Sequence, residues 1–139
     1  MGDKFISKYE DLRDILILMQ YSNLHKDWNT EDICKCILVP VMLNQYKVVR
    51  KKNELVMFAS WAFPTDKQVD EYVRKLSFPH EGYQGDGKDI WLVDFIAKKG
   101  YTRIGFLILK KMLTKMGFRK AFWFRPETKK LGWHTWKGT

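Results

Sequence analysis

A chain of 139 residues with 45% hydrophobic and 15% aromatic residues is long enough for one domain with a sizeable core, which excludes a disordered tail. No apolar run reaches the roughly 18 residues of a membrane span, and no secretory signal is visible, so we expect a cytoplasmic protein. Residues 1–97 carry 13 Lys and Arg against 15 Asp and Glu, whereas residues 98–139 carry 12 against a single acid, Glu127. The basic C-terminal third predicts an acidic partner: nucleic acid, an anionic membrane, phosphate or an acidic protein.

Two helices with a short connection between them are predicted at the beginning of the chain. The sequence S-K-Y-E at residues 7–10 has the form of a capping box, and apolar residues follow at helical spacing, which predicts a helix over residues 8–21. Asn29 or Thr30 can cap the second helix, which Pro40 should kink or shorten. The connection between the helices is a place where functional side chains are often presented.

Strands and helices alternate along the rest of the chain. The predicted elements are a strand over 46–50, a turn over 51–54, a strand over 55–62, a helix opened by Pro64 and Thr65, a loop over 77–88, a strand over 89–97, a helix capped by Thr102 that runs to about Met116 and ends at Gly117, and a strand over 119–125 stopped by Pro126. This order predicts an α/β fold with one mixed, mainly antiparallel sheet flanked by helices. We expect a single domain over residues 1–139, with a short basic tail from about residue 126.

His25 and Asp94 are the candidate catalytic residues. His25 lies in the connection between the first two helices, where a histidine is well placed to act as a base near neutral pH. Asp94 is a lone carboxylate in an apolar strand, which is costly unless it has a partner or a task. From the residues alone, a capping or core histidine and a carboxylate that caps a loop or pairs with a core arginine are the alternatives. His80 and His134 receive no role.

The turn that follows the strand of Asp94 has features of a phosphate site. It contains Gly100 and Gly105 and the cations Lys98, Lys99 and Arg103, and it leads into a helix N-terminus, which suits an anion. A plain basic turn explains the same residues equally well.

The cysteines and tryptophans are predicted to be mainly structural. Cys34 and Cys36 are expected to be reduced, partly buried thiols, with a nucleophilic cysteine as the alternative. No Cys/His cluster accompanies them, so no metal site is expected. Trp28, Trp61 and Trp91 are expected in the core, and the alternative is that they line an apolar slot.

Four motifs in order give a resemblance to a known family. They are S-x-L-H-x-x-W at residues 22–28, N-Q-Y at 44–46, S-W-A at 60–62 and W-x-x-D-x-I-A-x-x-G at 91–100. Together they resemble the toxin-activating lysine acyltransferases of the RTX (repeats-in-toxin) systems, over roughly residues 8–126.

The resemblance implies a fold similar to that of the GNAT acetyltransferases and a cytoplasmic enzyme. Such enzymes take a fatty acyl chain from acyl-carrier protein and attach it to the ε-amine of internal lysines of a protoxin. The resemblance places the catalytic histidine on His25, the catalytic aspartate on Asp94 and a supporting serine on Ser22. It implies no bound cofactor, because the acyl donor is the thioester on the 4′-phosphopantetheine arm of the carrier. Many members of the family form homodimers.

An acidic acyl-carrier protein is a specific candidate partner for the basic C-terminal third. The candidate contacts with the carrier or its phosphopantetheine are Lys98, Lys99, Gly100, Arg103, Lys110 and Lys111. The further candidate docking residues are Lys115, Arg119 and Lys120. The chain is shorter than most members of the family, which leaves open a target other than an RTX protoxin.

Two other functions stay open from the sequence. One is a CoA-dependent acetyltransferase of GNAT type. The other is a nucleic-acid-binding module that uses aromatic residues interleaved with the basic ones. These aromatic residues are Phe118, Phe122, Trp123 and Phe124.

Overall fold

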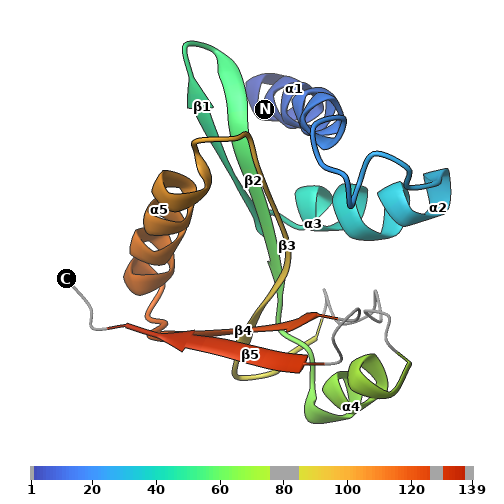
Figure 1. Cartoon of the computed structure of the whole chain (residues 1–139), viewed down its shortest axis with the longest axis vertical. Coiled ribbons are helices and arrows are strands. Elements are labelled where there is room, and N and C mark those ends of the chain that lie inside the picture. Colours follow the sequence, from blue (N-terminus) through green and yellow to red (C-terminus); the bar gives the residue numbers. More distant parts are fainter. Residues whose placement is uncertain (1, 76–84, 126–129, 137–139) are drawn as a thin grey trace.

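One five-stranded sheet with helices on both faces makes up the part of the chain that the computed structural model describes, residues 2–75, 85–125 and 130–136 (Figure 1). The elements are α1 (Gly2–Met19), α2 (Thr30–Ile33), the π-helical turn η1 (Cys34–Leu38), α3 (Val39–Met42), β1 (Tyr46–Lys51), β2 (Glu54–Ala62), α4 (Asp66–Lys75), β3 (Ile90–Ala97), α5 (Thr102–Lys115), β4 (Lys120–Arg125) and β5 (Lys130–Thr135). The expected mixed α/β fold is confirmed. Residues 77–84 of the predicted loop, including His80, and Pro126 lie outside the described residues.

The strands follow chain order across the sheet, and all neighbours are antiparallel except β3 and β4. This parallel pair joins only near the beginning of each strand, where Ile90 lies opposite Ala121 and Trp91 opposite Phe122. The helix α5 is the crossover connection that a parallel pair requires. Beyond the paired residues the strands diverge, and Figure 1 shows β4 and β5 leaving β3 at a wide angle.

Two hydrophobic clusters hold the helices on the sheet. On one face, apolar residues of α1, η1 and α3 pack against Phe58 and Ile96 of the central strands. On the other face, Leu109 and Leu113 of α5 pack against Trp61 and its neighbours. The central strands are therefore covered on both faces (Figure 1). Within the described residues, no helix combines the length and the apolar character needed to cross a membrane.

The beginnings of two predicted helices differ from the observed ones. Because α1 begins at Gly2, the motif that starts at Ser7 lies inside the helix and does not cap it. Thr102 is the first residue of α5 rather than its cap, and Tyr101 at the cap position makes no side-chain bond to the helix end. Pro40 lies in the first turn of α3, directly after η1, where its missing N–H costs least.

The residues predicted as a basic tail contain the strand β5. This strand pairs antiparallel with β4 along its whole length. Trp136 Nε1 donates to Thr114 Oγ1 at 2.6 Å, which attaches the end of β5 to α5. Pattern reasoning missed the strand because Gly132 interrupts its run of β-forming residues. That glycine lies opposite Trp123, whose indole comes within 2.4 Å of the position a Cβ would take.

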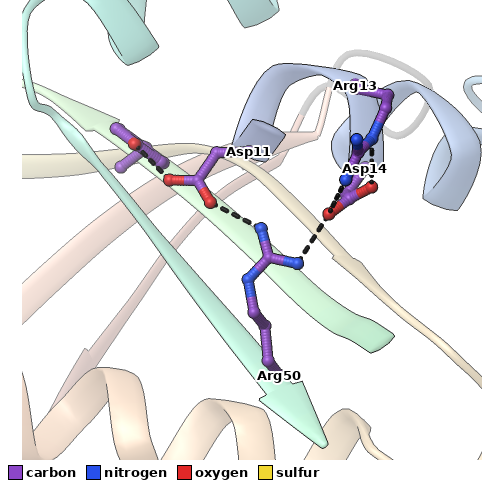
Figure 2. A network of polar contacts seen from close by, with 5 residues as sticks. Asp11, Arg13, Asp14 and Arg50 are labelled. Atoms are coloured by element: carbon purple, nitrogen blue, oxygen red, sulfur yellow. Dashed lines mark hydrogen bonds and ion pairs between the residues drawn. The ribbon is translucent and has the colours of Figure 1, made fainter. Parts of the chain in front are cut away.

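A network of polar contacts attaches α1 to β1, as Figure 2 shows. Arg50 of β1 reaches two carboxylates of α1, with Nη2 2.6 Å from Asp11 Oδ1 and Nη1 2.6 Å from Asp14 Oδ2. Arg13 contacts the same Asp14 carboxylate at 3.0 Å, and the Tyr46 hydroxyl donates to Asp11 Oδ2 at 2.6 Å. These bonds fix the orientation of α1, and with it the start of the connection that follows the helix.

Candidate active site

The connection between α1 and α2 folds back on itself and presents His25. The amide of His25 donates to the carbonyl of Ser22 at 3.1 Å, and the amide of Trp28 donates to the carbonyl of His25 at 3.1 Å. The Asn29 side chain accepts from the amide of Asp32 at 2.8 Å, which confirms the predicted cap of α2. His25 is only 3% exposed, and its ring centre lies 4.6 Å from that of Trp28.

A β-bulge in β3 turns Asp94 toward this connection. Ser60 of β2 lies opposite Asp94, but the next residue, Trp61, lies opposite Leu92, so β3 contains one extra residue, Val93. Because side chains alternate between the faces of a strand, the extra residue reverses the alternation. Leu92 consequently packs on the α5 side of the sheet, whereas Asp94 faces the side covered by α1 to α3.

The structure brings His25, Asp94 and Ser22 together. His25 Nε2 lies 2.8 Å from Asp94 Oδ1, and His25 Nδ1 lies 2.6 Å from Ser22 Oγ. Because an ionised carboxylate only accepts hydrogen bonds, Nε2 carries the ring proton and donates it to Asp94. Nδ1 is then the acceptor, and the hydroxyl of Ser22 donates to it. The three side chains form one polarised chain of hydrogen bonds.

Ionisation of Asp94 has a free-energy cost in this buried position. Its side chain is 10% exposed, and burial raises its pKa above the ordinary value of a carboxyl, while the bond from His25 acts in the opposite direction. A carboxylate held in apolar surroundings next to one imidazole can stabilise a positive charge that forms on that ring during a reaction.

The pair lies on the wall of a cavity of about 1250 Å³. This cavity lies where β3 and β4 diverge, and its walls come from both faces of the sheet. The lining residues are Leu24, His25, Trp28, Cys36, Tyr72, Leu92, Val93, Asp94, Phe95, Thr102, Arg103, Phe106, Leu107, Lys110, Trp123 and His134. A mainly apolar cavity with a few convergent polar groups is typical of a small-molecule site.

Two of the six predicted carrier contacts line the cavity, namely Arg103 and Lys110. Lys98 does not, because it forms an ion pair with Glu54, and its Nζ lies 4.6 Å from the ring centre of Tyr21. Three others also lie outside the lining: Lys99, Gly100 and Lys111. The cations at the cavity therefore come from within α5 rather than from the turn that precedes it.

The glycines of the predicted phosphate turn have structural explanations. Gly100 has a φ of +91°, a backbone conformation that residues with a Cβ rarely adopt. Gly105 lies inside α5, where a Cβ would come within 2.7 Å of Met57 Cγ, so the glycine allows the helix to approach β2. Both glycines therefore have structural explanations, and the phosphate site at this turn stays a prediction beside the plain basic turn.

Cys36 and Trp28 both line the cavity, and the thiol of Cys36 is not suited to act as a nucleophile. Burial, helped by the nearby carboxylates, raises the pKa of the Cys36 thiol to about 12, which argues against the alternative of a nucleophilic cysteine. Trp61 and Trp91 are core residues, as expected, with 4% and 5% of their surface exposed.

His134 is a cavity residue that the sequence did not reveal. It lies on β5 with its ring centre 5.9 Å from that of Phe106 and 6.0 Å from that of Trp136. The alternation of Trp133, His134, Thr135 and Trp136 is a strand signal that could have found it.

Known proteins resemble this chain in sequence and fold. The chain is 26% identical over 130 residues to the leukotoxin-activating lysine-acyltransferase LktC of Mannheimia haemolytica serotype A1, covering 91% of this chain and 75% of that protein. It is 29% identical over 86 residues to the protein-lysine palmitoyltransferase CyaC of Bordetella bronchiseptica, covering 62% of this chain and 46% of that protein. The loading GNATL domain of CurA from Lyngbya majuscula has the same fold, with a TM-score of 0.56, 17% identity, and coverage of 83% and 60%.

The family match extends over residues 5–136, nearly the whole chain. These residues include the connection that presents His25, the bulged strand with Asp94, and β5. The chain therefore belongs to the RTX toxin acyltransferase family.

Proposed function

We propose that this protein is a lysine acyltransferase that moves a fatty acyl chain from acyl-carrier protein to the ε-amine of an internal lysine of a target protein. The observation that supports the proposal most directly is the His25–Asp94 pair on the wall of a large apolar cavity. The names of the relatives describe lysine acylation, and one of them describes transfer of a palmitoyl chain.

The chemistry of the acceptor requires a base. A lysine amine has an ordinary pKa of about 10.4, so at neutral pH it is almost wholly protonated and cannot attack a thioester. His25 accepts the proton at Nδ1, and Asp94 stabilises the positive charge that results. Because the Ser22 hydroxyl donates to Nδ1, this hydroxyl relays the proton. The amine nitrogen then forms a bond to the acyl carbon, the carbon–sulfur bond breaks, and the nitrogen gives up its second proton. One of the two protons returns through His25 to the carrier sulfur, which leaves as the thiol, and the other goes to solvent.

The cavity suits a long acyl donor. Its volume of about 1250 Å³ exceeds the range of roughly 300–1000 Å³ typical of sites for compact ligands, as expected for a fatty chain together with a pantetheine arm. Arg103 and Lys110 supply cations for the phosphate of that arm. Lys111 and Lys115 are exposed on the same helix, where they can attract an acidic carrier.

The proposed target is an RTX protoxin, by extension from the relative that activates a leukotoxin. The proposed location is the cytoplasm, where a carrier-bound donor and an unsecreted toxin are both present. A homodimer stays a prediction, which light scattering of the purified protein can check.

Nucleic-acid binding is less favoured because two of the four aromatic residues predicted to stack on bases, Phe118 and Phe122, pack against other rings of the protein. The ring centre of Phe118 lies 5.9 Å from that of Phe63. Phe122 is stacked on Trp91 with ring centres 5.2 Å apart and an angle of 17° between the rings. Rings engaged in this way are not available to stack on bases.

The test is a donor-and-acceptor assay. Purified protein is incubated with palmitoyl-carrier thioester, with and without a candidate protoxin, and thioester loss and the mass of the acceptor are followed. We expect acyl-lysine only when both are present, and a rate roughly 10²–10⁴-fold lower for His25→Ala. Lys26→Ala, an exposed neighbour in the same connection, is the matched control and should keep the rate.

Two outcomes would contradict the proposal. A folded His25→Ala protein with an unchanged rate would remove the assigned base. Efficient turnover of acetyl-CoA on a free amine, with no use of the carrier thioester, would establish the CoA-dependent alternative.

A further inference from the structure

Ser60 is a buried polar residue without an evident structural reason. Its side chain is 0% exposed, and within the described residues its Oγ has no hydrogen-bond partner. Buried hydroxyls in folded proteins are nearly always hydrogen-bonded, because an unpaired one loses its bonds to water and gains nothing in return. The hydroxyl of Ser60 therefore stays in the core at a cost to stability.

The position of Ser60 links it to the catalytic pair. Ser60 lies directly opposite Asp94 in the β2–β3 ladder, at the residue where the bulge begins. Its neighbour Phe58 packs in the cluster beneath α1, so Ser60 shares that face of the sheet with Asp94. Side chains opposite each other in an antiparallel pair have Cβ atoms about 4.5–5.5 Å apart. A serine oxygen is one bond from Cβ and a carboxylate oxygen two bonds, so rotation of the serine side chain can join them.

One oxygen of Asp94 is available for such a bond. His25 Nε2 occupies Oδ1, and in the part of the chain that the structure describes no donor reaches Oδ2. We propose that Ser60 is a positioning residue for the acyl transfer, and that its hydroxyl donates to Asp94 Oδ2 when His25 takes up a proton. The bond holds Asp94 as a carboxylate at the moment when the neighbouring imidazole becomes positive. This inference rests on the proposed function of the site, and it adds a residue to it.

Other titratable groups near Asp94 do not substitute for Ser60. His25, from the connection between α1 and α2, already binds Oδ1 of Asp94. From η1, the Cys36 thiol is a weak donor that stays protonated in the working range, because its pKa is about 12. From β1, Tyr46 lies on the other side of Ser60, and its hydroxyl donates to Asp11 of α1.

The test compares Ser60→Ala with the wild type and with Ser60→Thr, which keeps the hydroxyl. The titration of the Asp94 carboxyl is followed by carbon-detected NMR, and acyl transfer is measured as a function of pH. If Ser60 donates to the carboxylate, Ser60→Ala moves the Asp94 titration and the acidic limb of the pH–rate profile to higher pH, because the ionised form loses a donor. We expect Ser60→Ala to lower kcat roughly tenfold with KM unchanged, and Ser60→Thr to restore kcat and the Asp94 titration.

The control is Thr114→Val, which removes a partly buried hydroxyl from α5 on the other face of the sheet and should leave the Asp94 titration unchanged. Coincident titration curves for the wild type and Ser60→Ala would overturn the role of Ser60, even with acyl transfer confirmed. The NMR measurement needs no donor or acceptor. A shifted titration in a protein without transferase activity would therefore refute the proposed function and leave the contact standing.

Discussion

At the scale of single residues, ionisation of Asp94 supports the proposed activity but lowers the stability of the folded protein. Burial raises the pKa of its carboxyl, so the folded protein binds a proton at this site more tightly than the unfolded chain does. The free energy of unfolding therefore decreases as the pH rises through the interval between the unfolded and folded pKa values of this carboxyl. At neutral pH the charge on which the proposed catalysis depends is therefore held at the expense of stability.

Asp94→Asn should separate these two effects. The amide keeps the shape and removes the charge, so we expect a higher Tm than the wild type at pH 7 and a difference that shrinks as the pH falls toward 4. Acyl transfer should fall roughly 10²–10⁴-fold, because the imidazolium loses its counter-charge. Thermal unfolding by circular dichroism from pH 4 to 8 measures the first effect. Asp89→Asn, at an exposed carboxylate, is the control, and a lower Tm for Asp94→Asn at pH 7 would contradict the argument.

The residues that form the Ser22–His25–Asp94 contact could be predicted from the sequence, but most of their surroundings could not. His25, Asp94 and Ser22 belong to motifs whose order and spacing mark them. Lys98 lies within the motif at residues 91–100 and is predicted to contact the carrier. In the structure it forms an ion pair with Glu54, which depends on how two turns meet in space. Ser60 was visible as part of a motif, but only the strand register places it opposite Asp94.

At the scale of elements, the attachment of α1 to β1 supports the start of the active-site connection. Arg50 joins two carboxylates of the helix (Figure 2). Arg13 above all, and also Arg50, lower the pKa of Asp14, so the contribution of this contact is fully present above the unfolded pKa of an aspartate, about 3.9. It is lost as the pH falls through the lower folded value.

Arg50→Met should lower the free energy of unfolding by about 1 kcal/mol at neutral pH, since it removes two charge-assisted bonds at a partly exposed site. The difference from the wild type should narrow below about pH 4, where the aspartates protonate. Urea unfolding at pH 7 and at pH 3 measures it. Arg74→Met on the exposed face of α4 serves as the comparison, and equal losses in both variants would show that the network contributes nothing specific.

β5 shows how one small residue can shape the cavity from outside it. Gly132→Ala would place a methyl group 2.4 Å from the indole of Trp123, which lines the cavity. The ring must move, and overpacking of this kind costs about 1–3 kcal/mol. We expect a lower Tm, an altered tryptophan fluorescence spectrum, and a KM that increases more for long-chain than for short-chain donors. Thr135→Ala on the exposed side of the same strand should change none of these.

The order of elements up to β4 could be read from the sequence because each has a clear apolar period and clear turn residues. The bulge at Val93 could not, since every residue of the strand 90–97 other than Asp94 is apolar and no local pattern marks the extra residue. The strand β5 could not be predicted from the sequence, because Gly132 within it is explained only by the indole of Trp123 on the neighbouring strand.

At the scale of the whole molecule, the uneven charge suggests how the proposed carrier protein is attracted. Lys111 and Lys115 lie one turn apart on the exposed side of α5, next to the helix residues that line the cavity. The double variant Lys111→Glu, Lys115→Glu should raise KM for the carrier roughly tenfold at low salt with kcat unchanged. Added salt should reduce the difference.

Steady-state kinetics at two ionic strengths provide the measurement. The matched control reverses two exposed lysines on α4, Lys67→Glu and Lys75→Glu, which leaves the net charge change the same. If both pairs raise KM equally, the overall charge of the protein and not the face of α5 attracts the carrier.

The short parallel pairing of β3 and β4 has a consequence for how such an enzyme can diversify. Ile90 and Trp91 are the only residues of β3 that pair with β4, so the gap between these two strands is bordered by side chains and is not closed by a ladder of backbone bonds. Substitutions along this gap can lengthen or shorten the space for a chain without breaking the sheet. Descendants of one ancestor could thus acquire preferences for different fatty acids through a few replacements, while the base and its carboxylate stay where they are.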